Sequence, residues 1–380
     1  MADELRILRI ITRLNVGGPS LQAIDLSVNQ NNWKTRLLSG QLKEGEVSLH
    51  AYMENKNIEH HTLQHLVHPL HPLKDLWALF ELICEIKKFQ PDVIHTHHAK
   101  AGLLGRVAAL LCGVVVVHTF HGNVFRGHYS PMKSKIICLV EKCLSPLAHR
   151  LIAISPSQQK DLTELFKITH KNKCPVIPLG FHLERFENCS QDKNKARESN
   201  ALPSHVPLIG IVGRLTHVKN HHFFLEVFAQ GDSTWHCVII GDGELENDIK
   251  EQVKQLKIED RVHFKATCNN IEKYYATLDI LAITSHSEGT PVTMIEAMAQ
   301  GLAVVAADVG GIPDLAAGTE RALLYPAGSK KECLEAFQQC LNNPSATLER
   351  CQKAKDYVSR THSFAALSQQ LDALYREILP

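Results

Sequence analysis

Apolar residues in the first half of the chain fall into short runs that alternate with stretches of helical spacing. The runs are rich in Ile, Leu and Val and predict buried strands at residues 5–12, 92–97, 114–120 and 150–155. Between them, residues 72–89 and 101–112 carry apolar residues at the spacing of amphipathic helices. Strands and helices that alternate in this way predict a parallel sheet with helices on both faces.

A polar stretch without periodicity, from Asn188 to Pro207, interrupts this alternation and predicts a linker over residues 186–206. The alternation then restarts. Further runs predict strands at residues 207–215, 236–243, 261–266, 278–285, 302–308 and 321–328. We therefore expect an α/β chain of two doubly wound, Rossmann-like domains, residues 1–185 and 207–359, that face each other across a cleft at the carboxyl ends of their strands.

The composition narrows the class of protein. With 44% hydrophobic residues, 21% charged residues and a formal net charge of +1, the 380 residues are typical of a soluble globular protein and predict no nucleic-acid partner. The 11 cysteines include no C-x-x-C pair, and the first residues are charged, which predicts reduced thiols and a cytoplasmic location. The longest apolar run, residues 107–117, is shorter than the roughly 20 residues of a membrane-spanning helix, and its glycine is expected to separate a helix from a strand.

Candidate chemistry in the second half lies where predicted strands end. Arg214 and Lys219 follow one strand in GRLTHVK and lead into a helix, so the two cations suit a diphosphate. A solvated surface pair is the alternative interpretation. Gly241 belongs to a Gly-Asp-Gly turn after the next strand, where the backbone could approach a flat ring. An ordinary tight turn explains that motif equally well.

The segment SEGTPVTMIEAMAQG combines a helix start with two carboxylates, Glu288 and Glu296. Pro291 suits the first turn of a helix, whose backbone N–H groups attract an anion. Three residues would supply those groups: Thr290, Val292 and Thr293. The two carboxylates can accept hydrogen bonds from sugar hydroxyls while the helix end and the cations hold phosphates. We therefore expect a polyol and a diphosphate to bind side by side here.

In the first half, Gly17 and Gly18 precede a helix that Pro19 can begin, and their backbone amides could contact phosphate or sugar oxygens. The loop is neither a Walker loop nor G-x-G-x-x-G, which argues against ATP or a dinucleotide. His121 ends another strand and is expected in the cleft. The chain has 23 histidines, but no spacing typical of a zinc site, so we predict no metal. The histidine-rich segment 60–71 is expected to be a surface feature.

These motifs together resemble the retaining glycosyltransferases of family four, which have the two-domain GT-B fold. The most specific part is SEGTPVTMIEAMAQGLAVVAADVGGIPDL, supported by GIVGRLTHVKN and PLGFHLERF, and the resemblance covers nearly the whole chain. It implies a nucleotide-diphosphate-sugar donor, with UDP as the favoured nucleotide, bound mainly by the second domain, with no metal and no resident cofactor. It also implies that a final helix, residues 360–380, returns to the first domain.

The resemblance assigns roles to individual residues. Arg214 and Lys219 would hold the diphosphate, Glu296 the ribose and Glu288 the hydroxyls of the donor sugar. Backbone amides from Pro291 to Thr293 would complete the phosphate site. In the first domain, His121 would face the transferred sugar and Gly18 would lie at the phosphates or the acceptor. Phe181 and His182 depart from the family pattern, which usually has a loop ending in Asp at that point.

One further resemblance concerns the acceptor. The stretch HTHHAKAGLLGRVAA and the following HTFHGNVF are similar to transferases that build bacterial surface polysaccharides, which implies a saccharide or lipid-linked acceptor. Residues 126–150 combine basic residues with an apolar helical stripe. This stretch could rest on anionic lipid at the inner face of the plasma membrane, or it could be a core-facing helix with a basic edge.

The expected reaction is sugar transfer with retention at the anomeric carbon. Arg214, Lys219 and the helix N-terminus would stabilise the departing diphosphate, so no acid is needed for the leaving group. Glu288 is expected to orient donor hydroxyls, and the alternative is that it acts as a nucleophile. Two other functions stay open at this point: a nucleotide-sugar epimerase and a non-catalytic nucleotide-sugar sensor.

Overall fold

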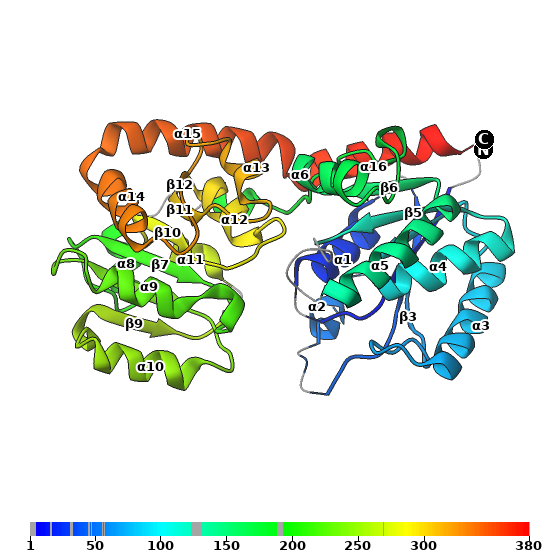
Figure 1. Cartoon of the computed structure of the whole chain (residues 1–380), viewed down its shortest axis with the longest axis horizontal. Helices are drawn as coiled ribbons and strands as arrows, with labels where there is room; N and C mark the ends of the chain where they lie inside the picture. The colour runs from blue at the N-terminus through cyan, green and yellow to red at the C-terminus, as the bar shows by residue number, and fades with distance from the viewer. Residues whose placement is uncertain are drawn as a thin grey trace. The chain divides into compact units, whose positions relative to one another are not determined.

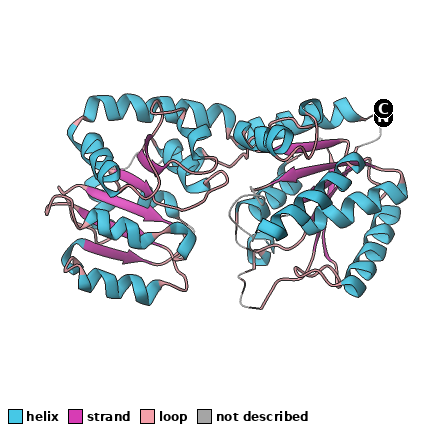
Figure 2. Ribbon diagram, in the orientation of Figure 1, coloured by secondary structure: helices cyan, strands magenta, loops and turns pink. Residues whose placement is uncertain are grey.

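The computed structural model describes residues 5–15, 17–30, 33–44, 46, 48–54, 56, 58–122, 131–187, 193–268 and 270–379. It divides into two compact units. Unit 1 comprises Met1–Gly180 and Ala365–Pro380, and unit 2 comprises Phe181–Phe364. Each unit contains a six-stranded sheet whose strands all run parallel, with helices around it (Figure 1, Figure 2). The predicted pair of Rossmann-like domains is therefore confirmed.

The sheet of unit 1 has the order β3-β2-β1-β4-β5-β6. Its strands are β1 (Arg6–Ile11), β2 (Lys34–Ser39), β3 (His60–Thr62), β4 (Val93–His97), β5 (Val115–Phe120) and β6 (Arg150–Ala153). The apolar runs predicted β1, β4, β5 and β6, but β2 and β3 were not predicted. Four of the six residues of β2 are polar and β3 is a short edge strand of sequence HHT, so neither forms an apolar run.

Helices cover both faces of this sheet. They are α1 (Gly18–Asn29), α2 (His50–Glu54), α3 (Pro72–Phe89), α4 (Ala99–Cys112), α5 (Pro131–Leu144), α6 (Pro156–Lys160) and α16 (Phe364–Ile378). Leu8 and Ile10 of β1 pack in the core cluster of α3 and α4, whereas Ile11 packs with α1. The crossovers that contain α3, α4 and α5 all step in one direction along the sheet, so right-handed connections place these three helices on the same face.

Helix ends follow local signals. The backbone N–H of Lys74 donates to Nδ1 of His71 in front of α3, and Pro72 occupies the first turn. Gly113 has a left-handed φ of 68° and ends α4 directly before β5, as its position in the apolar run predicted.

Helix α16 brings the end of the chain back to unit 1, as the resemblance implied. Its Tyr375 is fully buried, and the Trp33 and Tyr375 rings meet edge to face with centroids 5.5 Å apart. Asp372 accepts hydrogen bonds from Gln30 Nε2, at 3.0 Å, and from the indole of Trp33. These contacts fix α16 against the segment between α1 and β2.

The sheet of unit 2 has the order β12-β11-β10-β7-β8-β9. Its strands are β7 (Leu208–Val212), β8 (His236–Ile240), β9 (Val262–Lys265), β10 (Ile280–Ile283), β11 (Ala303–Ala307) and β12 (Leu323–Tyr325). All lie within the predicted runs. The helices are α7 (Glu184–Glu187), α8 (Lys193–Ser199), α9 (His221–Phe228), α10 (Glu246–Gln255), α11 (Ile271–Tyr275), α12 (Val292–Gln300), α13 (Ile312–Ala316), α14 (Lys330–Asn342) and α15 (Pro344–Thr361).

The chain passes between the units earlier than the predicted linker, at Gly180 and Phe181, and again at Phe364 and Ala365. Residues 188–192 of that linker lie outside the described residues, but 193–199 form α8 of unit 2. Arg197 of this helix is buried, and its guanidinium lies 2.7 Å from Asp279 Oδ2. The polar composition therefore belongs to a helix anchored by a buried ion pair.

The first crossing coincides with the departure from the family pattern. The backbone N–H of Phe181 donates to the carbonyl of His362 at 2.9 Å, and the His182 ring stacks on Phe364 with centroids 4.7 Å apart. The two segments that leave unit 2 are thus bonded to each other. None of the described helices is both long enough and apolar enough to span a membrane.

Candidate functional site

The loops that follow the adjacent strands β7 and β10 meet at the carboxyl edge of the sheet of unit 2. The backbone N–H of His286 donates to the carbonyl of Val218 at 2.8 Å, and the Thr284 hydroxyl donates to the carbonyl of Lys219 at 3.0 Å. Lys219 Nζ lies 2.7 Å from Glu288 Oε1, and the Ser285 hydroxyl donates to the same oxygen at 2.6 Å. The structure therefore brings the predicted Lys219 and Glu288 together.

Arg214 lies in the same loop as Lys219 but is exposed. Its side chain makes no hydrogen bond or ion pair within the part of the chain that the structure describes. The Lys219 side chain, by contrast, is 26% exposed and already faces Glu288, which is 11% exposed. One guanidinium is thus available to an anion, and one ammonium is held in place by a carboxylate.

Gly241 is required by packing within the unit. Its φ is +149°, and a Cβ at this position would lie well inside van der Waals contact of the carbonyl oxygen of Gly213. The backbone after β8 therefore approaches the backbone after β7 closely, and this packing alone explains the glycine. Contact between this turn and a flat ring stays a prediction.

Helix α12 begins one residue later than predicted. Pro291 is the N-cap residue, with φ −70° and ψ 116°, and Val292 is the first helical residue. The backbone N–H groups of Val292 and Thr293 therefore lie in the first turn, where the helix itself supplies no acceptor. Oγ1 of Thr290 is buried and has no hydrogen-bond partner among the described residues. This end of α12 thus carries unused donors beside Glu288.

A glycine pair after β11 supports the Glu288 loop. The backbone N–H of Gly311 donates to the carbonyl of Glu288 at 3.2 Å. Gly310 has a φ of +57°, and a Cβ there would overlap the same carbonyl oxygen. The sequence contained this pair within the family motif, but we assigned it no role, because its crowding arises only when the two loops pack.

Glu296 lies in a separate polar environment further along α12. The Tyr275 hydroxyl donates to its Oε2 at 2.9 Å, and Arg185 Nη2 lies 3.6 Å from its Oε1. Burial raises the pKa of Glu296 to about 7, although the hydrogen bond from Tyr275 and the charge of Arg185 act in the opposite direction. Arg185 also lies 3.9 Å from Glu272. Neither Tyr275 nor Arg185 was predicted, since no local pattern marks them.

The predicted residues of unit 1 lie at the ends of its loops. Gly17 is the N-cap residue of α1 and Gly18 its first residue. A Cβ on Gly17 would meet only Pro19 Cδ, at 3.9 Å, so the packing of the described residues does not demand a glycine there. His121 follows β5, and its Nε2 lies 2.7 Å from Nδ1 of His97.

His121 is held in its neutral form. Burial and, to a smaller extent, the nearby His98 lower its pKa to about 3. Its Nδ1 is buried and has no hydrogen-bond partner among the described residues. His121 therefore offers one free ring nitrogen, while the other is fixed by His97. No group of three or more His, Cys, Asp and Glu in the described part of the chain is arranged to hold a metal ion.

A buried arginine underlies this row of histidines. Arg9 of β1 is fully buried and lies 3.2 Å from both the Tyr375 hydroxyl and Nδ1 of His95. It also donates to Gln30 Oε1, which leads to Asp372 of α16. The sequence did not predict this network, because the partners of Arg9 lie far from it along the chain.

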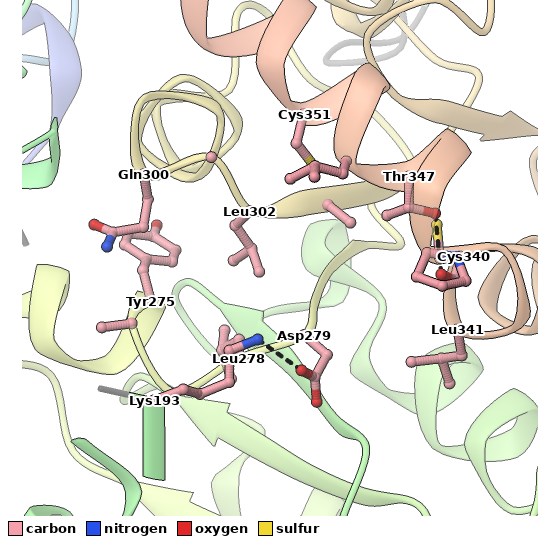
Figure 3. Close-up of a pocket in the computed structure, with 15 residues that line it drawn as sticks. Lys193, Tyr275, Leu278, Asp279, Gln300, Leu302, Cys340, Leu341, Thr347 and Cys351 are labelled. Atoms are coloured by element: carbon pink, nitrogen blue, oxygen red, sulfur yellow. Dashed lines mark hydrogen bonds and ion pairs between the residues drawn. The ribbon is translucent and has the colours of Figure 1, made fainter. Parts of the chain in front are cut away.

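A hollow of 430 Å³ in unit 2 is lined by Tyr275 but by neither Lys219 nor Glu288 (Figure 3). Its walls include Asp279 and Leu302, which precede β10 and β11, so it opens at the amino edge of the sheet. Lys193 and Asp279 pair there at 2.8 Å, while Cys340, Leu341 and other mostly apolar side chains complete the lining. None of the predicted site residues lines this hollow.

Two family models match the chain. Residues 38–185 match Glycosyltransferase Family 4, and residues 192–359 match Glycosyl transferases group 1. The two matches follow one another along the chain in the order of the two predicted domains, but the second begins inside the predicted linker 186–206.

Curated relatives are also similar. The chain is 32% identical to the UDP-Gal:alpha-D-GlcNAc-diphosphoundecaprenol alpha-1,3-galactosyltransferase of Escherichia coli, over 63% of this chain and 63% of that protein. It therefore matches less than two thirds of that relative's length. It is 26% identical to the D-inositol 3-phosphate glycosyltransferase of Corynebacterium aurimucosum, over 76% of this chain and 72% of that protein.

A solved structure shares the fold. The crystal structure of HepE from Anabaena in complex with UDP has a TM-score of 0.86 at 21% identity, and the match covers 98% of this chain and all of that one. The chain therefore matches one glycosyltransferase domain model in each half, in order, and has the GT-B fold along almost its whole length.

Proposed function

We propose that this chain is a retaining, metal-independent glycosyltransferase that moves a hexose or N-acetylhexosamine from a nucleotide-diphosphate sugar to a saccharide or lipid-linked acceptor. The pathway would be synthesis of a cell-surface polysaccharide or lipopolysaccharide. The observation that carries the proposal is the Lys219–Glu288 pair, which lies beside the unused donors of Thr290 and the first turn of α12. A cation, a helix N-terminus and a carboxylate suit a sugar diphosphate.

The donor diphosphate would be bound by Arg214, Lys219 and the N–H groups of Val292 and Thr293. Negative charge grows on this group as the glycosidic bond breaks, so donors that are already in position stabilise the transition state. Neither a general acid for the leaving group nor a metal is required by this arrangement, and no resident cofactor is part of the proposal.

Glu288 would orient the hydroxyls of the donor sugar. Its carboxylate already accepts hydrogen bonds from Lys219 and Ser285, which fixes its direction. The acceptor would then attack from the face that the diphosphate leaves, which retains the configuration at the anomeric carbon. His121 would meet the transferred sugar as a neutral imidazole that donates or accepts through Nδ1, and the Gly17–Gly18 amides would contact phosphate or acceptor oxygens.

Glu296 would accept hydrogen bonds from the ribose hydroxyls. Tyr275 and Arg185 orient this carboxylate and favour its charged form. A uridine base is our choice because the name of the E. coli relative specifies UDP-Gal as donor. The same name specifies a diphosphoundecaprenol-linked acceptor, which supports a lipid-linked acceptor and work at the cytoplasmic face of a membrane.

The test starts with a thermal-shift panel of nucleotide sugars, since a ligand of the native state raises its stability. The stabilising donor is then incubated with lipid-linked and free saccharide acceptors, and products are identified by mass spectrometry and by NMR of the anomeric proton. Transfer with retention, lost in Arg214→Ala and Lys219→Ala but kept in the control Lys254→Ala on α10, supports the proposal.

Two results would contradict the proposed transferase function and point to another one. An epimer formed without acceptor would identify a nucleotide-sugar epimerase. Binding of the donor with neither transfer nor hydrolysis would identify a sensor.

A further inference from the structure

Helix α3 exposes an apolar stripe on its outer side. Leu73, Leu76, Trp77 and Phe80 are 70, 67, 57 and 59% exposed, and their spacing places them on one side of the helix. The inner side, which includes Ala78, Leu82 and Ile86, is buried in the core of unit 1. The helix is therefore apolar on both sides, and only one of them is covered by the described chain.

The acidic residues of α3 all have partners in the same unit. Asp75 pairs with Lys100, Glu81 lies 2.8 Å from Nδ1 of His65, and Glu85 lies 3.0 Å from Arg36. His65 belongs to the histidine-rich segment 60–71, so that segment contacts this helix. Three lysines of α3 are left exposed: Lys74, Lys87 and Lys88.

Helix α5 repeats this arrangement. Its outer side carries Met132, Ile136, Leu139 and Val140, which are 75, 57, 62 and 41% exposed. Its acidic residue, Glu141, is buried and pairs with Arg106 at 2.8 Å. The exposed charges are again lysines only: Lys133, Lys135 and Lys142.

The two stripes lie on the same face of unit 1, because α3, α4 and α5 all cover one side of its sheet (Figure 1). Helix α4 adds Leu110 and Leu111 at its end, 61 and 63% exposed. We name this surface the α3–α5 face and define it by its exposed apolar residues: Leu73, Leu76, Trp77, Phe80, Leu110, Leu111, Met132, Ile136, Leu139 and Val140.

A basic hollow adjoins the end of α5. It is 770 Å³ in volume and opens beside Pro146 of the short turn that follows the helix. Its lining includes His149, Arg150, His170 and Lys173, and Glu377 is the acidic residue that pairs with Arg150 there. Arg150 and Lys173 therefore continue the positive charge beyond the apolar stripe of α5.

We propose that the α3–α5 face docks on the surface of an anionic phospholipid bilayer. Trp77, Phe80 and the apolar residues of α5 would enter the interface, while the lysines would contact headgroup phosphates. Amphipathic helices with an apolar side and a lysine-rich border bind membranes in this way, and each basic residue adds electrostatic attraction.

Charge decides between the possible occupants of this face. Because the exposed charges of α3 and α5 are all positive, a second copy of the same face would be repelled. A nucleic acid would use the lysines but not the apolar stripes. An anionic bilayer uses both. The proposal concerns a different surface from the sugar-donor site, and it bears on the proposed function only because a lipid-linked acceptor lies in a membrane.

The test measures binding of the full chain, without sugar donor, to sedimented vesicles. Phosphatidylcholine vesicles with phosphatidylglycerol should bind the chain, and pure phosphatidylcholine vesicles should bind it at least about tenfold more weakly. High salt should weaken the binding to the anionic vesicles. Transfer assays play no part, so failure here and failure of the proposed function are distinguishable.

Paired variants identify the surface. Trp77→Ser with Phe80→Ser removes part of the apolar stripe, and Lys133→Glu with Lys135→Glu reverses charge on α5. Each pair should reduce binding about tenfold or more. Matched controls on unit 2 are Leu348→Ser, at a position 71% exposed, and Lys254→Glu, at a side chain 67% exposed, and these should bind as the unchanged chain does. All substituted side chains are exposed, and circular dichroism verifies the fold.

Trp77 also provides a direct signal. Of the 3 tryptophans, Trp33 and Trp235 are buried, whereas Trp77 is exposed. Anionic vesicles should shift the emission of the chain to the blue, brominated lipid tails should quench it, and Trp77→Phe should abolish both effects. The proposal is overturned if the Trp77–Phe80 double variant binds vesicles normally, or if light scattering detects a dimer that this variant loses.

Discussion

The ammonium of Lys219 lies 2.7 Å from a carboxylate oxygen of Glu288 and joins the loops after two adjacent strands of unit 2. Each residue therefore holds the other in place before any ligand arrives. A diphosphate bound at the N-terminus of α12 would compete with Glu288 for the ammonium and would leave the carboxylate free to accept hydrogen bonds from sugar hydroxyls.

Replacement of Lys219 by Ala should lower transferase turnover by roughly 10²–10³-fold, because the leaving diphosphate loses a preorganised cation. Stability should change by only about 1 kcal/mol, since the pair is partly exposed. Steady-state kinetics with the stabilising donor and a denaturant titration measure the two effects. Lys254→Ala is the matched control. Turnover within twofold of the unchanged enzyme would contradict the assignment.

Glu296 should make stability depend on pH near neutrality. Burial raises its pKa to about 7 from an ordinary 4.5, so the folded chain holds this proton more tightly than the unfolded chain. The contribution is fully present below pH 4.5 and is lost as the pH rises through 7. Glu296→Gln keeps a neutral side chain at every pH. The unchanged chain should therefore lose up to about 3 kcal/mol relative to this variant between pH 4.5 and 8.

Denaturant titrations of both proteins across this range measure the difference. The exposed Glu251→Gln on α10 is the control, and it should track the unchanged chain at every pH. A constant gap between the Glu296→Gln variant and the unchanged chain would show that Glu296 titrates in its ordinary range.

Tyr275→Phe removes the hydroxyl that donates to Glu296. The pKa of Glu296 should rise further, because this hydrogen bond favours the carboxylate. If Glu296 holds the ribose, KM for the donor should rise about tenfold with kcat nearly unchanged, since a hydrogen bond to a charged group contributes roughly 1.5–3 kcal/mol. Tyr274→Phe changes the neighbouring ring and serves as control. A fall in kcat at constant KM would place Tyr275 at the reacting atoms instead.

Gly310→Ala should destabilise unit 2 by several kcal/mol or displace the Glu288 loop, because the new methyl group would overlap the carbonyl oxygen of Glu288. Gly301→Ala is a matched control. Its φ is also positive, at +78°, but a Cβ there meets nothing within 4 Å, so it should cost only about 1 kcal/mol. Thermal unfolding of both variants separates the overlap from the backbone strain. Equal losses would show that the loop moves aside freely.

His121 should remain neutral throughout the working range of the enzyme. Burial lowers its pKa to about 3, so the folded chain resists a proton that the unfolded chain accepts near pH 6.5. This contribution to stability is present above pH 6.5 and is lost as the pH falls toward 3. His121→Asn should remove that part of the acid sensitivity.

The NMR signal that disappears in His121→Asn identifies the ring, and its chemical shift should not change between pH 8 and 5. A midpoint near 6.5 for that signal would contradict the neutral assignment.

The sequence indicated strands and helices well where burial leaves a local pattern. β5 is buried on both faces and begins with three consecutive valines, and the bounds of α3 match the predicted 72–89. β2 was missed because Arg36 at its centre is buried through ion pairs with Glu59 and Glu85, which are distant in sequence. The linker was misplaced for a similar reason, since Arg197 finds its partner Asp279 in unit 2.

For the site, the motif residues could be named in advance, but their supports could not. Tyr275 and Arg185 meet Glu296 only after α7, α11 and α12 pack together. Similarly, helical spacing revealed an apolar stripe in residues 126–150 without showing on which side the core would lie. The structure describes only 131–150 of that stretch, and there Ile137 and Cys138 face the core while Ile136 and Leu139 face outward.

The return of α16 to unit 1 bears on how the polypeptide reaches its native state at the ribosome. Arg9 is translated 366 residues before Tyr375, whose hydroxyl accepts its hydrogen bond. Unit 2, by contrast, is one uninterrupted stretch. Domains commonly fold in their order of synthesis. Here unit 2 can fold before unit 1, because the guanidinium of Arg9 in unit 1 lacks its Tyr375 partner until α16 has been made.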